Sequence, residues 1–411
     1  MLFRNAFTHD TRGRREAVAL ARAGHRVTVV AVHADPSLPA REEHDGVVVE
    51  RIRVTGKIFG AARAAGRGPG AGRNGTSTPA PESTLRNLVV SAGRTTSTGM
   101  FEWKAAHHAA GLHPDVYHCR DFNTLLGGVL ASRRSPASIV YDSNELYAHL
   151  NVPHPTMLRR YTVETLEGWA IHRAAHVITV SPGIAEHLSR RYGIPKPTVI
   201  MNVPSSRPAG ATAEVPEPFR LGGVKILYLG GITPRRGIEQ AIDALPMLPG
   251  ARLIAMGPVL DQSYLRAVNA RAQAAGVAGR FHVLPPVPAE HVIPVASHAT
   301  VGLVAMQNTC LSHYLALPNK LFECLHAGLP VVASDFPETR RVVEEHDAGR
   351  TCDPGDPASI AAAISAVVQD PERHEAMSRN ARAAAVEFSW EREAPKLLAL
   401  YETLAPLGAR A

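Results

Sequence analysis

Runs of apolar, mostly β-branched residues recur along the whole chain, and segments with helical spacing separate them. The clearest run is Val27–Val32. A run of this length with almost no polar alternation is typical of a strand buried on both faces, as in a parallel sheet. Repeated strand–helix–strand units therefore predict an α/β fold made of doubly wound, Rossmann-like sheets.

The same pattern places the individual elements. In the first half, strands are expected at Val27–Val32, Val47–Val54, Asp115–His118, Ser138–Tyr141, Val177–Val180 and Thr198–Met201. In the second half, they are expected at Lys225–Leu229, Arg252–Met256, Arg280–Leu284, Thr300–Val304 and Leu329–Ala333. The intervening helices should begin near Gly237, Ser263, Pro288 and Asn319, and three more are expected at 356–369, 371–387 and about 390–405.

A chain of 411 residues is too long for one ordinary core, so two domains of roughly 200 residues each are expected. Residues 204–222 are rich in Pro, Gly and Ser and lose periodicity, which indicates a linker. The first domain is then 1–203 and the second 223–388, and residues 389–411 form a helix that we expect to pack back toward the first domain. Two such domains are expected to face a cleft, where the carboxyl ends of open α/β sheets bind ligands.

Composition restricts the class of protein. Hydrophobic residues make up 45% and charged residues 20%, as in soluble globular proteins. The chain has no apolar run long enough to span a membrane and no leader-like N-terminus, so a cytoplasmic location is expected. Its four cysteines are far apart with no CxxC pair, and neither a zinc site nor a disulfide framework is expected.

The formal charge of +7 is concentrated in residues 51–94, which hold eight basic residues and one acidic residue. A basic segment of this kind is typical of a solvated loop, and equally of a segment that contacts an anionic acceptor, a membrane surface or nucleic acid. The segment lacks interleaved aromatic residues, which disfavours base stacking and hence nucleic acid.

One candidate ligand site follows the strand that ends at Leu229. Gly230 and Gly231 allow close approach of the backbone to a ligand, and the helix start near Gly237 offers N–H groups to a phosphate. Arg235 or Arg236 can add a charged hydrogen bond. A purely structural β–α turn explains the same residues.

A second candidate is the segment 317–334. Pro318 and Asn319 suit a helix start, and Lys320 and Glu323 lie three residues apart in the first turn, on one side of the helix. A carboxylate there can accept both hydroxyls of a ribose, and a lysine can face a diphosphate. An ordinary surface ion pair is the alternative.

In the first half, polar clusters lie where strands end. Asp10 and Arg12 precede or begin a helix, and Asp10 suits an N-cap. Arg120, Asp121 and Glu145 follow two successive strands, at the edge where such sheets place catalytic groups.

Taken together, these segments resemble the family-four retaining glycosyltransferases of the GT-B fold, in the branch with Pro-Asn-Lys-x-Phe-Glu. The resemblance runs almost end to end. It rests on Gly230-Gly231 with Arg236-Gly237, Pro318-Asn319-Lys320-x-Phe322-Glu323, Asp353-Pro354-x-Asp356-Pro357, Asp10-x-Arg12-x-x-Arg15-Glu16, Asp142-Ser143-x-Glu145-Leu146-Tyr147 and Val180-Ser181-Pro182.

The resemblance implies sugar transfer with retention from a nucleotide-diphosphate sugar to a small-molecule, glycan or lipid-linked acceptor, without metal or other cofactor. It assigns catalysis to Arg236, Lys320 and Glu323. It implies donor contacts at Gly230, Gly231, Arg235, Asn319 and Leu321, and acceptor contacts at Asp10, Arg12, Arg120, Asp121 and Glu145.

Two departures from the family pattern bear on activity. Leu315 stands where many members have a second glutamate that touches the sugar, and the usual opening strand before Asp10 is nearly absent. Loss of activity is therefore one alternative. The others are a nucleotide-sugar epimerase or hydrolase on the same fold, and a non-enzymatic protein that binds anions or nucleic acid.

Overall fold

The computed structural model describes residues 1–8, 10–53, 99–152, 156–206 and 214–404. The chain divides into two compact units. Unit 1 comprises Met1–Asn144, Glu164–Ile178 and Leu398–Ala411, and unit 2 comprises Glu145–Val163 and Thr179–Leu397. Within the described ranges, no helix combines the length and the apolar character that crossing a bilayer requires.

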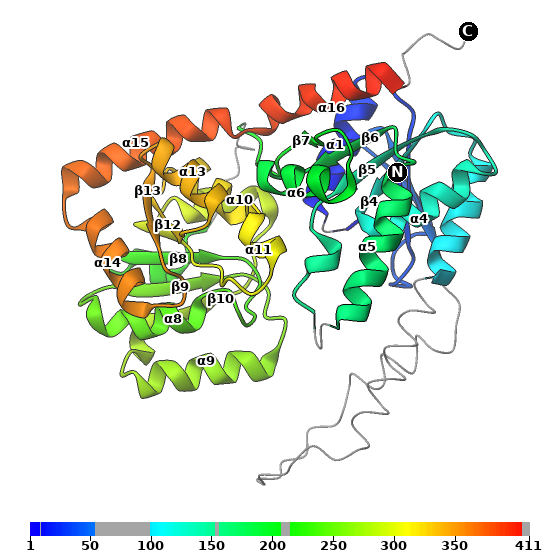
Figure 1. Ribbon diagram of the computed structural model, residues 1–411. Coiled ribbons are helices and arrows are strands. Elements are labelled where there is room, and N and C mark those ends of the chain that lie inside the picture. Colours follow the sequence, from blue (N-terminus) through cyan, green and yellow to red (C-terminus); the bar gives the residue numbers. More distant parts are fainter. Residues whose placement is uncertain (9, 54–98, 153–155, 207–213, 405–411) are drawn as a thin grey trace, which may run out of the picture. The chain divides into compact units, whose positions relative to one another are not determined.

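A six-stranded parallel sheet forms the centre of unit 2 (Figure 1), with the strand order β10-β9-β8-β11-β12-β13. The strands are β8 (Lys225–Leu229), β9 (Arg252–Met256), β10 (Phe281–Leu284), β11 (Val301–Val304), β12 (Val331–Ser334) and β13 (Gly349–Cys352). The order reverses between β8 and β11. In doubly wound sheets, ligands bind outside the carboxyl ends of the strands at such a switch point.

Helices cover both faces of this sheet. The helices of unit 2 are α6 (Pro182–Tyr192), α7 (Glu217–Arg220), α8 (Ile238–Ala244), α9 (Gln262–Ala274), α10 (Ala289–Ala296), α11 (Leu311–Leu315), α12 (Asn319–His326), α13 (Pro337–Glu345), α14 (Pro357–Val368) and α15 (Pro371–Glu387). Ile226 and Tyr228 of β8 point into a core with α8, α9 and α14. The alternate residues Leu227 and Leu229 point into a second core with α10, α12, α13 and α15. Burial on both faces explains why β8 is an unbroken apolar run.

Unit 1 carries a sheet with the order β1-β3-β2, and β4 and β5 belong to a second sheet with the order β4-β5-β6-β7. The strands are β1 (Val27–Val32), β2 (Arg41–His44), β3 (Val47–Ile52), β4 (Val116–Arg120), β5 (Ser138–Ser143), β6 (His176–Thr179) and β7 (Thr198–Val199). Leu2 forms parallel bridges with both Val30 of β1 and Cys119 of β4. Met1–Phe3 therefore lies between β1 and β4 and connects the two strands, although the sequence predicted almost no strand before Asp10.

Two helices of unit 1 lie near its functional residues. They are α1 (Thr11–Arg22) and α4 (Asp121–Ser132), and residues 99–111 are also helical. The Phe3 ring packs closely against Gly13 of α1, since a Cβ at this position would lie 2.4 Å from the ring. Two helices have residues in both units, namely α5 (Met157–Ile171) and α16 (Trp390–Leu404).

The predicted α/β class with two Rossmann-like domains is confirmed. The four cysteines, Cys119, Cys310, Cys324 and Cys352, are free thiols. Two other sequence predictions fall on residues outside the described ranges. They are most of the basic segment, at residues 54–94, and the middle of the linker, at residues 207–213.

Candidate functional site

The chain turns sharply after β8, at the switch point of the unit 2 sheet. Gly230 has a φ of +117°, and its N–H donates to the Met256 carbonyl at 3.0 Å. Gly257 follows the neighbouring strand β9, and a Cβ on it would lie 2.1 Å from the Gly230 oxygen. The two turns thus pack backbone against backbone, which only glycine permits. This packing fixes the Gly230 turn at the carboxyl end of β8.

The two arginines after this turn have different environments. Arg235 is exposed, has a φ of +68° and directs its guanidinium to the Asn151 side chain. Arg236 is partly buried, and its guanidinium lies 3.3 Å from the Met306 sulfur, just beyond β11. Gly237 is required next because a Cβ would lie 2.1 Å from the Ala305 oxygen. The residue pattern did not distinguish the two arginines, whereas the family resemblance implied Arg236, and the structure places Arg236 at the switch point.

Lys320 reaches the same turn from the start of α12. Its ammonium nitrogen lies 3.8 Å from the centre of the Tyr228 ring, and the Cβ position of Gly230 lies 3.5 Å from that nitrogen. The pKa of Lys320 falls to about 7, because burial and, to a smaller extent, repulsion from Arg236 lower it more than the charge of Glu323 raises it. Arg236, Lys320 and Glu323 therefore act on one another electrostatically at one place.

Such a place favours anions. Two cationic side chains that repel each other are stabilised when a negative charge binds beside them. The site thus has the charge that a diphosphate requires, and Glu323 supplies a hydrogen-bond acceptor near it.

The other predicted donor residues are placed in different ways. Gly231 accepts a hydrogen bond through its carbonyl from the Tyr228 hydroxyl at 2.9 Å. Asn319 is exposed at the first position of α12. Leu321 is fully buried in the core, and its N–H donates to the Pro318 carbonyl at 3.0 Å, so the residue positions α12.

His313 and Tyr228 lie at this site, although sequence reasoning did not select them. Burial lowers the pKa of His313, and the nearby charges of Arg236 and Arg235 lower it further. His313 belongs to the five-residue helix α11, which has no periodicity long enough to predict. Tyr228 lies in the apolar strand β8, where an aromatic side chain is expected to be part of the hydrophobic core.

Leu315, noted above as a departure from the family pattern, lies at the end of α11. Its carbonyl accepts a hydrogen bond from the Ser181 hydroxyl at 2.6 Å, and its side chain lies against Gly183. Ser181 is also the N-cap of α6. This position therefore connects α11 to α6 through side-chain packing and a hydrogen bond from a hydroxyl to a backbone carbonyl.

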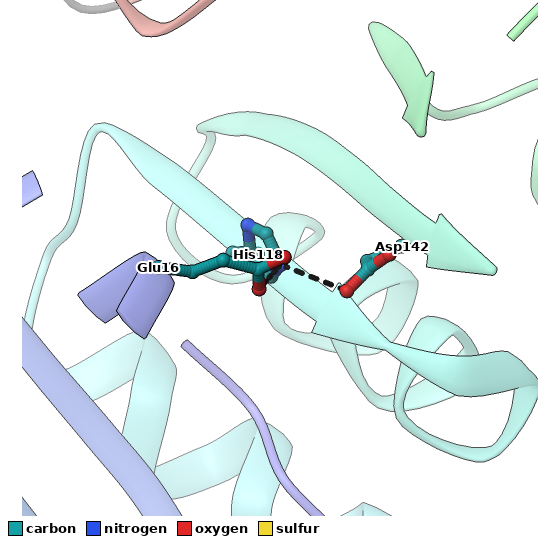
Figure 2. A group of neighbouring side chains, drawn as sticks. All are labelled: Glu16, His118 and Asp142. Carbon is teal, nitrogen blue, oxygen red and sulfur yellow. Dashed lines mark ion pairs between the residues drawn. The ribbon is translucent and has the colours of Figure 1, made fainter. Parts of the chain in front are cut away.

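The predicted acceptor residues Asp10, Arg12 and Arg120 belong to a largely buried ion network at β4 and β5. Figure 2 shows three other members, Glu16, His118 and Asp142. Asp10 caps α1 by accepting from the Gly13 N–H at 2.9 Å, as predicted, and pairs with Arg120 Nε at 3.1 Å. Arg12 pairs with Glu16 at 2.8 Å and with Asp142 at 3.0 Å. The Nε2 atom of His118 lies 3.7 Å from Glu16 and 3.8 Å from Asp142.

The pKa values of the two buried carboxyl groups in this network, Glu16 and Asp142, are shifted in opposite directions. Burial alone would raise both pKa values, and it does raise the pKa of Glu16. Arg12, His118 and Arg120 instead hold the pKa of Asp142 well below its ordinary value. The network therefore contains one carboxyl group with a lowered pKa, Asp142, and one with a raised pKa, Glu16.

The oxygen and nitrogen atoms of Glu16, His118 and Asp142 lie within 4.8 Å of one another, which is close enough to share a cation. However, Arg12 at 3.0 Å and Arg120 at 3.3 Å already contact the Asp142 oxygens. A divalent ion would face both guanidinium groups at close range, so the donor set fits arginine better than a metal.

The two remaining acceptor candidates differ in position. Asp121 begins α4 with a φ of +66°, burial raises its pKa, and it accepts from the Asn144 amide at 3.3 Å. Glu145 is exposed and begins the segment of unit 2 that follows Asn144. The structure thus brings Asp10, Arg12, Arg120 and Asp121 together within unit 1, whereas Glu145 is assigned to the other unit.

A cavity of about 260 Å³ lies in unit 1 beside the loop that leads to Asp10. The sequence did not predict it. Its lining combines apolar and charged side chains from Phe7, Thr8, Arg14, Ala17, Val18, Leu38, Glu42, His44, Val47, Val49 and Arg51.

Two family models match the chain and divide it near the same linker. Residues 10–202 match the model described as "Glycosyl transferase 4-like domain", and residues 213–384 match "Glycosyl transferases group 1". The first match contains the ion network of unit 1, and the second contains the Gly230 turn and α12.

Curated relatives agree with these matches. A glycogen synthase of Mycobacterium tuberculosis is 24% identical over 394 residues, which cover 94% of this chain and 88% of the relative. A D-inositol 3-phosphate glycosyltransferase of Geodermatophilus obscurus is 32% identical over 197 residues, covering 44% of this chain and 41% of the relative.

Solved structures show the same fold. A sucrose-phosphate synthase from Thermosynechococcus elongatus has a TM-score of 0.74 at 20% identity, covering 95% of this chain and 92% of the other. Anabaena HepE in complex with UDP-glucose has a TM-score of 0.71 at 16% identity, covering 98% of each chain. With both halves matched by transferase models and the fold shared with these enzymes, the chain is a glycosyltransferase of the GT-B type.

Proposed function

We propose that this enzyme transfers a sugar, with retention, from a nucleoside-diphosphate sugar to a glycan, lipid-linked or small-molecule acceptor. The donor diphosphate binds beside the Gly230 turn, against Arg236 and Lys320. Glu323 accepts hydrogen bonds from the hydroxyls of the donor ribose. The second domain, residues 223–388, holds the donor, and the first, residues 1–203, holds the acceptor.

One observation carries this proposal, namely the convergence of Arg236, Lys320 and Glu323 at the switch point of the unit 2 sheet. An anionic ligand relieves the repulsion between the two cations. Bound ligands in related folds give further support, because HepE was crystallised with UDP and with UDP-glucose.

The chemistry needs charge stabilisation at the departing diphosphate. Arg236 and Lys320 provide that charge where negative charge accumulates in the transition state. In a retaining transfer, the acceptor hydroxyl attacks on the face that the diphosphate leaves, and a donor phosphate oxygen takes the proton. We propose that no metal or other cofactor takes part, because the two cations occupy the place of a metal beside the phosphates.

The acceptor end of the site comprises Asp10, Arg120 and Asp121. Asp10 and Arg120 are partly exposed and fixed by their mutual ion pair, so they can bind hydroxyl or phosphate groups. The curated relatives are named for acceptors such as glycogen, inositol phosphate and phosphatidyl-myo-inositol. We propose that the enzyme acts in the cytoplasm on an acceptor of one of these chemical kinds.

A panel of nucleoside diphosphates tests the donor assignment by thermal shift. A ligand that binds only the native state raises the melting temperature, and we expect one base to give the largest increase. Glu323→Gln should reduce kcat/KM for the matching sugar donor about ten- to hundredfold through loss of a charged hydrogen bond.

The exposed Glu372→Gln is the matched control and should leave kcat/KM unchanged. Activity should survive a metal chelator. The proposal is overturned if no nucleoside diphosphate stabilises the protein, or if donor is consumed at the same rate with and without any acceptor.

A further inference from the structure

The outer face of α5 exposes an unusual set of large apolar side chains. Met157, Leu158 and Tyr161 are 80%, 75% and 68% exposed, and Leu166 and Trp169 are 41% and 39% exposed. Because all five lie on one helix, the helix itself sets their relative placement. Tyr161, Leu166 and Trp169 follow Leu158 by three, eight and eleven residues, and Met157 lies four residues before Tyr161, so all five lie on one half of the helix surface.

The basic residues of α5 are exposed or partly exposed and its acidic residues are buried, so this face is cationic. Both of its acidic residues, Glu164 and Glu167, are buried, at 9% and 2% exposure. Arg160, by contrast, is exposed, and Arg159 is partly exposed. The face that meets solvent is thus apolar and positively charged, with no carboxylate of α5 on it.

Trp169 has two arginines beside its ring. The Arg173 guanidinium lies 4.0 Å from the ring centre and that of Arg133, from the end of α4, lies 5.8 Å away. Both arginines are exposed, as is the adjacent Arg134. A tryptophan that keeps an apolar body next to cationic groups is typical of side chains placed at the boundary of a bilayer.

We propose that the outer face of α5 docks on an anionic lipid surface. Met157, Leu158, Tyr161 and Trp169 enter the boundary between headgroups and acyl chains, and the neighbouring arginines pair with lipid phosphates. Apolar burial and attraction to anionic lipid together provide peripheral binding without a spanning segment. The charge favours lipid over a second copy of this chain, because two copies would bring the same cationic face together.

Vesicle co-sedimentation tests the proposal. The purified full chain should bind vesicles of phosphatidylcholine mixed with phosphatidylglycerol, bind less as salt rises, and bind pure phosphatidylcholine weakly. A triple variant, Met157→Ser, Leu158→Ser and Tyr161→Ser, should lower binding to the mixed vesicles by about tenfold or more. The control triple variant Leu112→Ser, Met247→Ser and Val386→Ser removes exposed apolar side chains elsewhere and should bind like the wild type.

A second measurement does not depend on the stability of the triple variant. Brominated lipids should quench tryptophan fluorescence on binding, and Trp169→Phe should remove most of that quenching. Trp103→Phe is the control, because Trp103 is 55% exposed on the helix 99–111 and should leave the quenching intact. Absence of wild-type binding to the mixed vesicles overturns the proposal, as does unchanged binding by the α5 triple variant. So does a dimer in solution that the same triple variant dissociates.

Discussion

Lys320 differs from an ordinary surface lysine in what surrounds its ammonium group. It lies over the Tyr228 ring and close to Arg236, and its pKa falls to about 7. Near neutral pH, the free protein therefore holds this lysine partly uncharged. A bound diphosphate favours the ammonium form, so positive charge increases at the site when the ligand arrives.

This property predicts that nucleoside-diphosphate binding is coupled to proton uptake. Above pH 7 the free protein has lost the Lys320 proton, whereas the complex, with a raised pKa, retains it. Affinity should therefore fall as pH rises above about 7, by at most about tenfold per pH unit. Calorimetric titrations in buffers of different ionisation enthalpy measure the number of protons taken up.

Two variants separate this effect from a general loss of charge. Lys320→Met should bind more weakly and with little proton uptake, while Lys320→Arg should keep charge at all accessible pH values and flatten the pH profile. Equal proton uptake by the wild type and Lys320→Met would contradict the assignment.

Arg236 and Arg235 form a natural pair of test and control. Arg236→Ala removes a cation beside Lys320, so we expect a higher donor KM and a lower kcat, with kcat/KM reduced about 10²–10³-fold. Arg235 is exposed and directed to Asn151, and Arg235→Ala should change kcat/KM less than about threefold. Steady-state kinetics with saturating acceptor distinguish the two variants. Similar losses of kcat/KM in both would contradict the assignment of donor binding to Arg236.

At the scale of elements, the loops after β8 and β9 shape the proposed donor site. They pack through Gly230 and Gly257, and Gly257 has a φ of +154°. No side chain fits between the two backbones, so the site depends on two glycines that face each other from neighbouring strands. The helix α8 begins only at Ile238, after a further close contact at Gly237.

Gly257→Ala should therefore disturb the donor site without touching a ligand. The new Cβ meets a backbone oxygen at 2.1 Å and the φ value is unfavourable, so we expect a loss of about 2 kcal/mol or more in the free energy of unfolding and weaker donor binding. Gly279→Ala is the control, because nothing lies within 4 Å of its Cβ position. Chemical denaturation and thermal shift with nucleotide measure both effects. A Gly257→Ala protein as stable as the control would show that the loops separate readily.

At the scale of the whole molecule, the end of α16 contributes to the buried network of unit 1. Tyr401 is 6% exposed, and its hydroxyl lies 2.9 Å from His118 Nδ1. His118 in turn lies beside Glu16 and Asp142. A residue near the end of the chain therefore completes a network whose other members come from α1, β4 and β5.

Tyr401→Phe tests this contribution. The substitution leaves the packing in place but removes the partner of a buried imidazole nitrogen, which should cost about 1–3 kcal/mol in stability. Thr403→Ala alters a hydroxyl on the same helix that bonds only within α16 and should cost less. Equilibrium unfolding measures the stability of each variant. Equal stability of the wild type and Tyr401→Phe would show that the Tyr401–His118 hydrogen bond does not stabilise the protein.

Much of the architecture followed from local patterns. Strands β8 and β9 begin and end at the residues expected from their apolar runs, and α15 spans the expected 371–387. The edge strands β2 and β13 were missed, because Arg41–His44 and Gly349–Cys352 are short and carry charged or small residues. Hydrophobic periodicity detects elements that are buried on a defined face, and these two strands lack that signal.

The sequence by itself determined the fold class, the glycine turn after β8 and the polar residues of α12, because glycine geometry and hydrophobic period act over a few neighbouring residues. Only the tertiary structure decided that Arg236 acts on Lys320 and that the Tyr228 ring lies against the Lys320 ammonium group. It also decided that Arg12 forms buried ion pairs with Glu16 and Asp142. These depend on residues such as Arg12 and Asp142, which are 130 positions apart. Packing of distant strands brings such side chains together, and no local rule encodes that contact.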